Sequence, residues 1–261
     1  MIKIVPVRLD RDNQLMEYFA GNTAFHKCER VIVETEHGEE MGRVVSKEKE
    51  TEVKKRYPRV VKKADAEDLK SFNAQQEEEL KDYSRVQKMV HEKELDMKLV
   101  KVYYTFDRKK MFIYYTAEGR IDFRELIKEL AAEFKKRIQM VQIGVRDEAN
   151  ILGGIGHCGK EVCCRRFLKD FQSVSIEMAK TQQLSSQLQK LTGLCGRLLC
   201  CLNYEYEFYR RIMEHAPRVG DIVTTPEGNA KVIEIQPILE EAKVEFEEGK
   251  IKTFKFPDLN K

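Results

Sequence analysis

Tryptophan is absent from this 261-residue chain, and proline and glycine are few, at 6 and 14 residues. That scarcity excludes a collagen-like fold and a low-complexity disordered chain. Long apolar runs are missing too, because no stretch approaches the ~20 apolar residues that a helix needs to cross a bilayer. The N-terminal Met1–Arg8 lacks the apolar core and the small-residue cleavage site of a signal peptide. We therefore expect a cytoplasmic protein with no membrane insertion.

A large excess of charge of one sign is also missing. The chain has 47 basic and 44 acidic residues and a net charge of +3, which permits nucleic-acid binding without indicating it. Catalytic patterns are missing as well. Gly153, Gly154 and Gly156 are not followed by the Lys-Ser/Thr pair of a phosphate-binding loop, and no His-Glu-x-x-His or Ser-His-Asp pattern stands out. We therefore expect that the protein is not an enzyme.

The apolar and polar patterns that are present predict an α+β fold in four segments. We expect a small N-terminal β domain with a basic linker over residues 1–63, and a long helix with a β-β-α-β layer over 64–149. A cysteine-rich metal-binding segment should occupy 150–216, and a small SH3-like β barrel 217–261. The linker is assigned from its basic residues, which are Lys54, Lys55, Arg56, Arg59, Lys62 and Lys63.

The long helix is predicted over about residues 65–97, where apolar residues recur at helical spacing. Its buried face should comprise Leu69, Phe72, Leu80, Tyr83, Val86, Val90 and Met97. The run Glu77–Glu79 should then point mostly outward.

The residues after this helix predict the β-β-α-β layer. Leu99–Phe106 and Met111–Ala117 are rich in aromatic and β-branched residues and should form a hairpin. Asp122, with Glu125 three residues on, should cap the next helix, and Ile138–Val145 should return as a strand.

Two short features lie outside these elements. Ile32–Gly38 and Ile222–Gly228 both read Ile-Val-x-Thr-x-x-Gly, which a shared turn type and an internal duplication explain equally well. Cys28 stands alone and is expected to be a small hydrophobic residue of the core.

The other six cysteines form a repeat. Cys158-Gly159-Lys160-Glu161-Val162-Cys163-Cys164 and Cys195-Gly196-Arg197-Leu198-Leu199-Cys200-Cys201 both read Cys-Gly-basic-x-x-Cys-Cys, 37 residues apart. Clustered cysteines in a reducing compartment bind metal or do chemistry more often than they form disulfides. We therefore predict that the ligands of a metal or cluster lie among Cys158, Cys163, Cys164, Cys195, Cys200 and Cys201.

Thiolates suit zinc, copper(I) and iron–sulfur clusters. The four-residue gap within each run is closer to plant-type ferredoxins than to the Cys-x-x-Cys knuckles of structural zinc sites. One solution is a four-thiolate site made of Cys158, Cys195 and one cysteine of each adjacent pair. Another is two three-thiolate sites, each completed by a partner or by His157. Redox-active thiols and buried structural cysteines are the remaining interpretations. Lys160, Arg165, Arg166 and Arg197 are expected to offset thiolate charge.

The run from Gly154 to Cys164 and the run Leu191–Glu205, together with the preceding β-β-α-β pattern, resemble the bacterial RicT/YaaT family. The shared module of that family is named after the C-terminal domain of a yeast polymerase-suppressor protein. The resemblance covers nearly the whole chain. One departure is visible, because Cys28-Glu29-Arg30 stands where family members often have Gly-Asp before a strand.

The resemblance implies a non-catalytic adaptor. Family members carry 4Fe–4S clusters in a complex with two small helical proteins, RicA and RicF, and support messenger-RNA processing by the endonuclease RNase Y. Effects on sporulation, competence and biofilm formation follow from this role. The ligand roles carry over to the six repeat cysteines as a set.

The alternative interpretation is a zinc-stabilised RNA-binding module that acts alone. Possible RNA contact rests on the basic clusters, among them Arg108–Lys110 and Arg210-Arg211, and on hairpin tyrosines whose rings could stack on bases. These tyrosines are Tyr103, Tyr104, Tyr114 and Tyr115.

Overall fold

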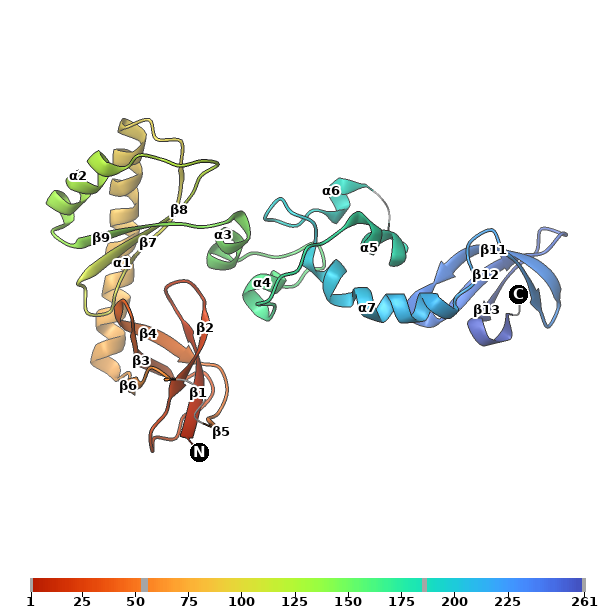
Figure 1. The fold of residues 1–261 in the computed structure, drawn as a ribbon, viewed down its shortest axis with the longest axis horizontal. Coiled ribbons are helices and arrows are strands. Elements are labelled where there is room, and N and C mark those ends of the chain that lie inside the picture. The colour runs from red at the N-terminus through yellow and green to blue at the C-terminus, as the bar shows by residue number, and fades with distance from the viewer. Residues whose placement is uncertain (1, 53–55, 185–186, 260–261) are drawn as a thin grey trace. The chain divides into compact units, whose positions relative to one another are not determined.

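The computed structural model describes residues 2–52, 56–184 and 187–259. The chain divides into two compact units, Met1–Gly153 and Gly154–Lys261, and both contain helices and a sheet (Figure 1). The predicted α+β class is confirmed, whereas the finer division into four segments stays a prediction. Lys54 and Lys55 of the predicted linker lie outside the described residues.

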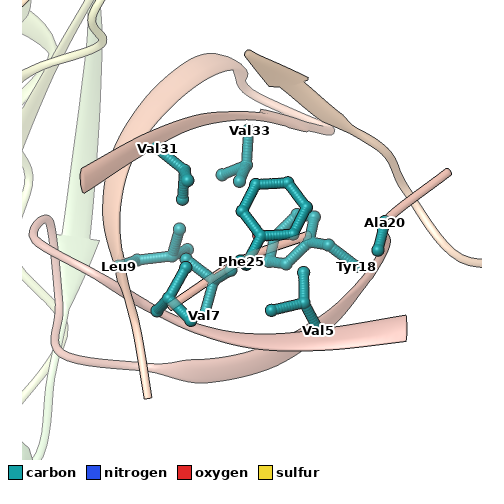
Figure 2. Packing of buried hydrophobic residues seen from close by; sticks show 9 residues of the cluster. Val5, Val7, Leu9, Tyr18, Ala20, Phe25, Val31 and Val33 are labelled. Carbon is teal, nitrogen blue, oxygen red and sulfur yellow. The ribbon is translucent and has the colours of Figure 1, made fainter. Parts of the chain in front are cut away.

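The first sheet of unit 1 curves around an apolar core. Its strands are β1 (Ile2–Leu9), β2 (Leu15–Phe19), β3 (Arg30–Thr35), β4 (Gly38–Val44), β5 (Lys49–Thr51) and β6 (Val60–Lys63). They pair in the order β2-β1-β4-β3-β6, and β5 also pairs with β1. Alternate residues of β1 point inward, as a sheet with one buried face requires. Figure 2 shows the ring of Phe25 surrounded by these inward side chains.

Part of the predicted basic linker is a strand, so that prediction was wrong there. β6 pairs antiparallel with β3, with Lys63 opposite Val31, and Val60 packs against the core. Lysines suit this position because an outermost strand is protected from pairing with other chains by charge.

The helix α1 (Ala66–Glu92) begins at Asp65, whose carboxylate accepts the backbone N–H groups of Glu67 and Asp68 in a capping box. It ends at Glu92, so the predicted end near Met97 was wrong, and its buried face also differs from the prediction. Leu80 is 72% exposed, whereas Glu79 is only 7% exposed. The apolar spacing predicted that Leu80 would be buried. The face of α1 that contacts the rest of unit 1 instead includes polar side chains, among them Gln75 and Glu79.

Those polar groups cover the outer edge of a neighbouring strand, β7 (Lys98–Tyr104). The Glu79 carboxylate accepts the backbone N–H of Tyr104 at 2.8 Å, and the Gln75 amide donates to the Tyr104 carbonyl at 2.9 Å. The Tyr83 hydroxyl donates to the Leu99 carbonyl at 3.1 Å. The helix therefore satisfies backbone groups that an edge strand would otherwise leave unpaired.

Burial of Glu79 has a consequence for pH dependence. Burial raises the pKa of Glu79 from 4.5 to about 7, although the N–H of Tyr104 acts in the opposite direction. The folded state thus holds a proton that the unfolded state has already released between these pH values. Stability should fall by about 3 kcal/mol as pH rises through this window. Glu79→Gln should show a smaller fall, measured as exchange protection of β7 amides, because Glu40, whose pKa burial also raises to about 7, still titrates there. The same slope in Glu79→Gln as in the exposed control Glu77→Gln would contradict this.

The second sheet forms the predicted β-β-α-β layer. β7 and β8 (Lys110–Thr116) form a hairpin, and α2 (Arg124–Phe134) then crosses to β9 (Arg137–Gln142), which is parallel to β8. Leu126 and Leu130 of α2 are fully buried against this sheet. The predicted capping box was wrong, because α2 begins after Phe123 and the Asp122 carboxylate binds the backbone and guanidinium of Arg124 instead.

A short helix, α3 (Val145–Leu152), follows β9 where the sequence predicted the end of a strand. Its residue Ile151 packs with Val100 and Tyr103 on the face of the sheet away from α2. The last strand thus ends three residues earlier than predicted.

Unit 2 begins with four helices, α4 (Cys163–Arg166), α5 (Ile176–Thr181), α6 (Leu188–Leu191) and α7 (Cys200–His215). Four strands follow, β10 (Ile222–Thr225), β11 (Gly228–Gln236), β12 (Glu241–Glu245) and β13 (Ile251–Lys255), with the one-turn helices Pro237–Leu239 and Phe256–Asp258. The strands pair in chain order as an antiparallel sheet, and Ile212 and Met213 of α7 pack against its core. The predicted β structure of this region is present, whereas closure into an SH3-like barrel stays a prediction.

The echo between the two ends of the chain extends beyond one turn. Thr35 and Thr225 both donate their hydroxyl to the carbonyl of a glycine three residues on, at 3.0 and 2.8 Å. The hairpins also begin alike. The N–H of Cys28 binds the Val44 carbonyl at 2.9 Å, as Gly220 binds Val232 at 2.8 Å. The likeness is limited to the turn and to the hairpin entry, because Gly220 lies two residues closer to its turn than Cys28 does.

The comparison also corrects the prediction for Cys28, which is exposed rather than part of the core. Its φ is +72°, and its counterpart Gly220 has φ +95°. Only glycine adopts such angles without steric cost.

We expect Cys28→Gly to raise the free energy of unfolding of unit 1 by about 0.5–1 kcal/mol, because relief of strain exceeds the added chain entropy. Gly220→Ala is the matched control and should destabilise unit 2 by about 1 kcal/mol. Chemical unfolding of the two variants measures both effects. A loss of stability in Cys28→Gly would show that the turn is unstrained.

Candidate metal centre

The two cysteine runs adopt the same backbone conformation. In the first run the N–H of Gly156 binds the Lys160 carbonyl at 2.8 Å, and in the second Gly193 binds Arg197 at 2.8 Å. The isolated bridges Ile155–Glu161 and Thr192–Leu198 are likewise 37 residues apart. The sequence repeat is therefore a structural repeat of two tight loops.

Glycine is required at one position of each loop. Gly159 has φ +74° and Gly196 has φ +73°, and each directly follows the first cysteine of its run. A side chain would strain this turn, which folds the backbone back toward the sulfur. The backbone of Gly156 also lies near the Cys158 thiol, because a Cβ added at Gly156 would be 3.7 Å from Cys158 Sγ.

Each loop leads into a helix that starts at its cysteine pair. α4 starts at Cys163 and the 16-residue α7 starts at Cys200. Free N–H groups and the positive end of the helix dipole gather at the start of α7, where they stabilise negative charge on a thiolate or on a cluster.

Thiols from the two runs lie close together. Burial, followed by the neighbouring thiols of Cys200 and Cys201, raises the pKa of Cys163 to about 11, and a hydrogen bond joins Cys163 to Cys200. The pKa of Cys164 is raised by burial and then by Cys200, with Cys195 also contributing. Cys195, Cys200 and Cys201 belong to the second run, so their thiols act on Cys163 and Cys164 of the first run. Neutral thiols are thus favoured while no cation is present to compensate their charge.

The pKa of Cys201 follows the same pattern. It is raised by burial first, then by Glu205 and Cys200, and Cys158 contributes from the first run. The thiols of Cys163, Cys164 and Cys201 are therefore each influenced by cysteines of the other run. Cys28 lies in unit 1 and belongs to neither run.

An aromatic pair accompanies the thiols. Phe167 and Tyr204 lie four residues after Cys163 and Cys200, and their rings meet edge to face at 5.1 Å between centroids. These positions are also 37 residues apart, as are Cys163 and Cys200. Extending the alignment of the runs by three residues would have found this pair, which sequence reasoning missed.

The chemistry of this donor set fits a thiophilic metal or an iron–sulfur cluster, since both runs supply thiols and thiols of one run influence those of the other. Within residues 2–52, 56–184 and 187–259, no three His, Cys, Asp or Glu side chains are arranged to hold a metal ion. Which of the six cysteines bind a metal stays a prediction, and the choice between the two predicted ligand sets stays open.

The surroundings bear on the other predicted roles. His157 is exposed, next to the exposed Cys158. The Arg165 guanidinium pairs with Glu161 at 3.1 Å, so part of its charge is already compensated.

Little apolar material holds this segment together. Its core comprises the buried Ala179, Leu191 and Leu202, with four partly buried neighbours. The Gln182 side chain adds a hydrogen bond of 2.6 Å to the Leu202 carbonyl. Gly154 provides a close contact as well, because a Cβ there would lie 2.8 Å from Leu194.

The hairpin tyrosines expose almost no ring surface on which RNA bases could stack, whereas possible RNA contact as such stays a prediction. Tyr103, Tyr104, Tyr114 and Tyr115 are all at most 4% exposed. The basic clusters are partly neutralised as well, because Arg108 pairs with Glu78, and Arg210 pairs with Glu207 and Glu214.

Known proteins resemble this chain. Residues 58–143 match the family described as the PSP1 C-terminal conserved region, and residues 173–216 match the third domain of PSP1-like proteins. The stage 0 sporulation protein YaaT of Bacillus subtilis (strain 168) is 45% identical over 240 residues, which cover 89% of this chain and 86% of YaaT. The predicted resemblance is confirmed.

Two fungal relatives share shorter regions. Protein PSP1 of Saccharomyces cerevisiae is 47% identical over 49 residues, 19% of this chain and 6% of that protein. An uncharacterized protein of Schizosaccharomyces pombe is 33% identical over 85 residues, 33% of this chain and 11% of its own length. No solved structure matches. Across the part of the chain that is described, no helix combines the length and apolarity that a bilayer crossing needs.

Proposed function

Since the chain belongs to the YaaT family of proteins that carry the PSP1 C-terminal conserved region, we propose that it is a non-catalytic adaptor subunit that binds an iron–sulfur cluster. The single observation that supports this most is the convergence of thiols from two identically folded runs. A 4Fe–4S cluster would be held by a subset of Cys158, Cys163, Cys164, Cys195, Cys200 and Cys201. When bound, it would supply structural and redox-sensitive cross-linking of the two runs.

The chain's own residues would support such a cluster in defined ways. Gly159 and Gly196 allow the tight turns, and the first turn of α7 offers backbone N–H groups to sulfur. The Phe167–Tyr204 ring pair, four residues after Cys163 and Cys200, ties the ends of the two runs to each other.

The biological role we propose follows the relative named for stage 0 of sporulation. The adaptor would act with two small helical proteins of the RicA and RicF type on messenger-RNA processing by RNase Y, and thereby on sporulation, competence and biofilm formation. The alternative, a zinc-stabilised RNA-binding module, has lost the support of its tyrosines, which are buried.

Partner binding has a candidate surface on α7. Phe208 is 57% exposed and Tyr204 is 61% exposed, one helical turn apart and next to the thiols. Large exposed aromatic side chains dominate the binding energy of many interfaces.

Co-expression with the two small helical proteins should give one stable complex, and Phe208→Ala should weaken it about tenfold or more. Leu80→Ala is the control, because Leu80 is also an exposed apolar side chain, at 72%, on α1 of the other unit. Size-exclusion chromatography and titration calorimetry measure the effect. If the chain elutes alone at micromolar concentration with its cluster intact, the adaptor hypothesis fails.

A further inference from the structure

The strand β9 leaves an open edge on the second sheet of unit 1. The sheet order is β7-β8-β9, so β7 and β9 are both outermost. The β7 edge is covered by α1, as described above. Among the described residues, by contrast, no other element donates to or accepts from the outer backbone of β9. None of the six residues of β9 is fully buried, although five residues of β8 beside it are.

The hydrogen bonds to β8 identify which backbone groups are free. The N–H of Arg137 binds the Lys109 carbonyl, and the N–H of Ile143 binds the Tyr115 carbonyl. Because inward and outward groups alternate along a strand, Arg137, Gln139 and Val141 face β8. Ile138 and Met140 therefore direct both their N–H and their C=O outward.

From this edge we propose that β9 pairs antiparallel with β9 of a second copy of the chain, about a twofold axis at Gln139. In this register Ile138 of one copy lies opposite Met140 of the other. Each such pair exchanges two backbone hydrogen bonds, and it occurs twice across the axis. The four outward groups of Ile138 and Met140 in each copy are then satisfied.

The side chains also favour a second copy as the partner strand. Ile138 and Met140 share the face that packs on the core under α1 and α2, so the pairing joins apolar surface to apolar surface. On the other face, Gln139 meets Gln139 and Arg137 meets Val141. No like charges lie opposite each other, so this register carries no charge repulsion between the strands. A register shifted to Met140 would place Ile138 opposite Gln142, a poorer match.

The first test is the oligomeric state of the full chain. Sedimentation equilibrium at micromolar concentration should give twice the 30.6 kDa of the single chain. Met140→Pro should shift the protein to the single-chain mass, because it removes an N–H that the sheet itself does not use. Met140→Leu should remain paired. A single-chain mass for the unaltered protein up to about 100 µM would overturn the proposal.

A charge exchange tests the register without risking the fold. Gln139→Glu and Gln139→Lys each place two like charges at the axis and should weaken association about fivefold or more. Mixing the two variants should restore association, because each mixed pair then has opposite charges. Weakening in both variants without recovery on mixing would show that Gln139 does not lie at the axis.

Discussion

Cys158→Ser and Cys195→Ser are each expected to lose most of the bound metal. Either serine removes the first thiol of one run, and the remaining thiols of both runs must then share a cation with one ligand fewer. Even loss of an outer-shell partner costs about 10–100-fold in metal affinity, so loss of a ligand should cost at least tenfold. The unaltered protein, isolated anaerobically with its partners, should be brown and contain iron and acid-labile sulfide.

Cys28→Ser is the control for this experiment. Cys28 is exposed in unit 1, so its serine variant should keep the full metal content. Visible absorption with iron, sulfide and zinc analysis reads out all three variants. Colourless protein with stoichiometric zinc would favour the zinc-stabilised module instead. Equal metal loss from Cys28→Ser would mean that the site has been assigned to the wrong residues.

The cysteine repeat shows what a sequence can predict well. Cys158 and Cys195 lie 37 residues apart, and a glycine follows each of them, which indicates a repeat. The backbone hydrogen bonds of the two loops show the same spacing of 37 residues. Local patterns of this kind depend on residues close together in the chain. The crossing of thiols between runs depends on how residues 167–190 fold back, which no local pattern contains.

Errors in the fold arose where long-range contacts override local preference. Glu79 was expected to face solvent because a glutamate side chain is rarely buried without a partner. It is buried because β7 presents an unpaired N–H at Tyr104. Similarly, Lys62 and Lys63 were assigned to a linker because they are basic, although they pair with β3 as part of a strand. In both cases the deciding partner is distant in sequence.

Cys28 illustrates a different limit. Its residue type favours burial, but its position is fixed by a turn that its counterpart fills with Gly220. The missing Gly-Asp pair was visible in the sequence as a departure from the family pattern. Only the backbone angle shows that the departure has a cost in strain.

Stability should be distributed unequally along the chain when the metal is absent. The first sheet has nine buried residues in its core cluster, and the second sheet and the C-terminal sheet have nine and seven. The core cluster of the cysteine segment has only three buried residues, although this segment must bring together two runs that lie 37 residues apart. Each buried aliphatic side chain contributes about 1.5–3 kcal/mol. Three of them cannot offset the entropy of ordering a segment of this length.

We therefore expect that chelation or exposure to oxygen loosens residues 150–205 and leaves 98–146 and 218–256 folded. Metal binding would supply the missing folding free energy locally, because the ligand set hardly exists in the open segment. Hydrogen exchange on the metal-free and metal-loaded protein tests this, with protection lost by at least tenfold in the first range alone. Partner binding should weaken in parallel, since Tyr204 and Phe208 belong to the helix that starts at Cys200. Equal protection in both forms would show a preformed ligand cage, and a sensor role for the cluster would have to be abandoned.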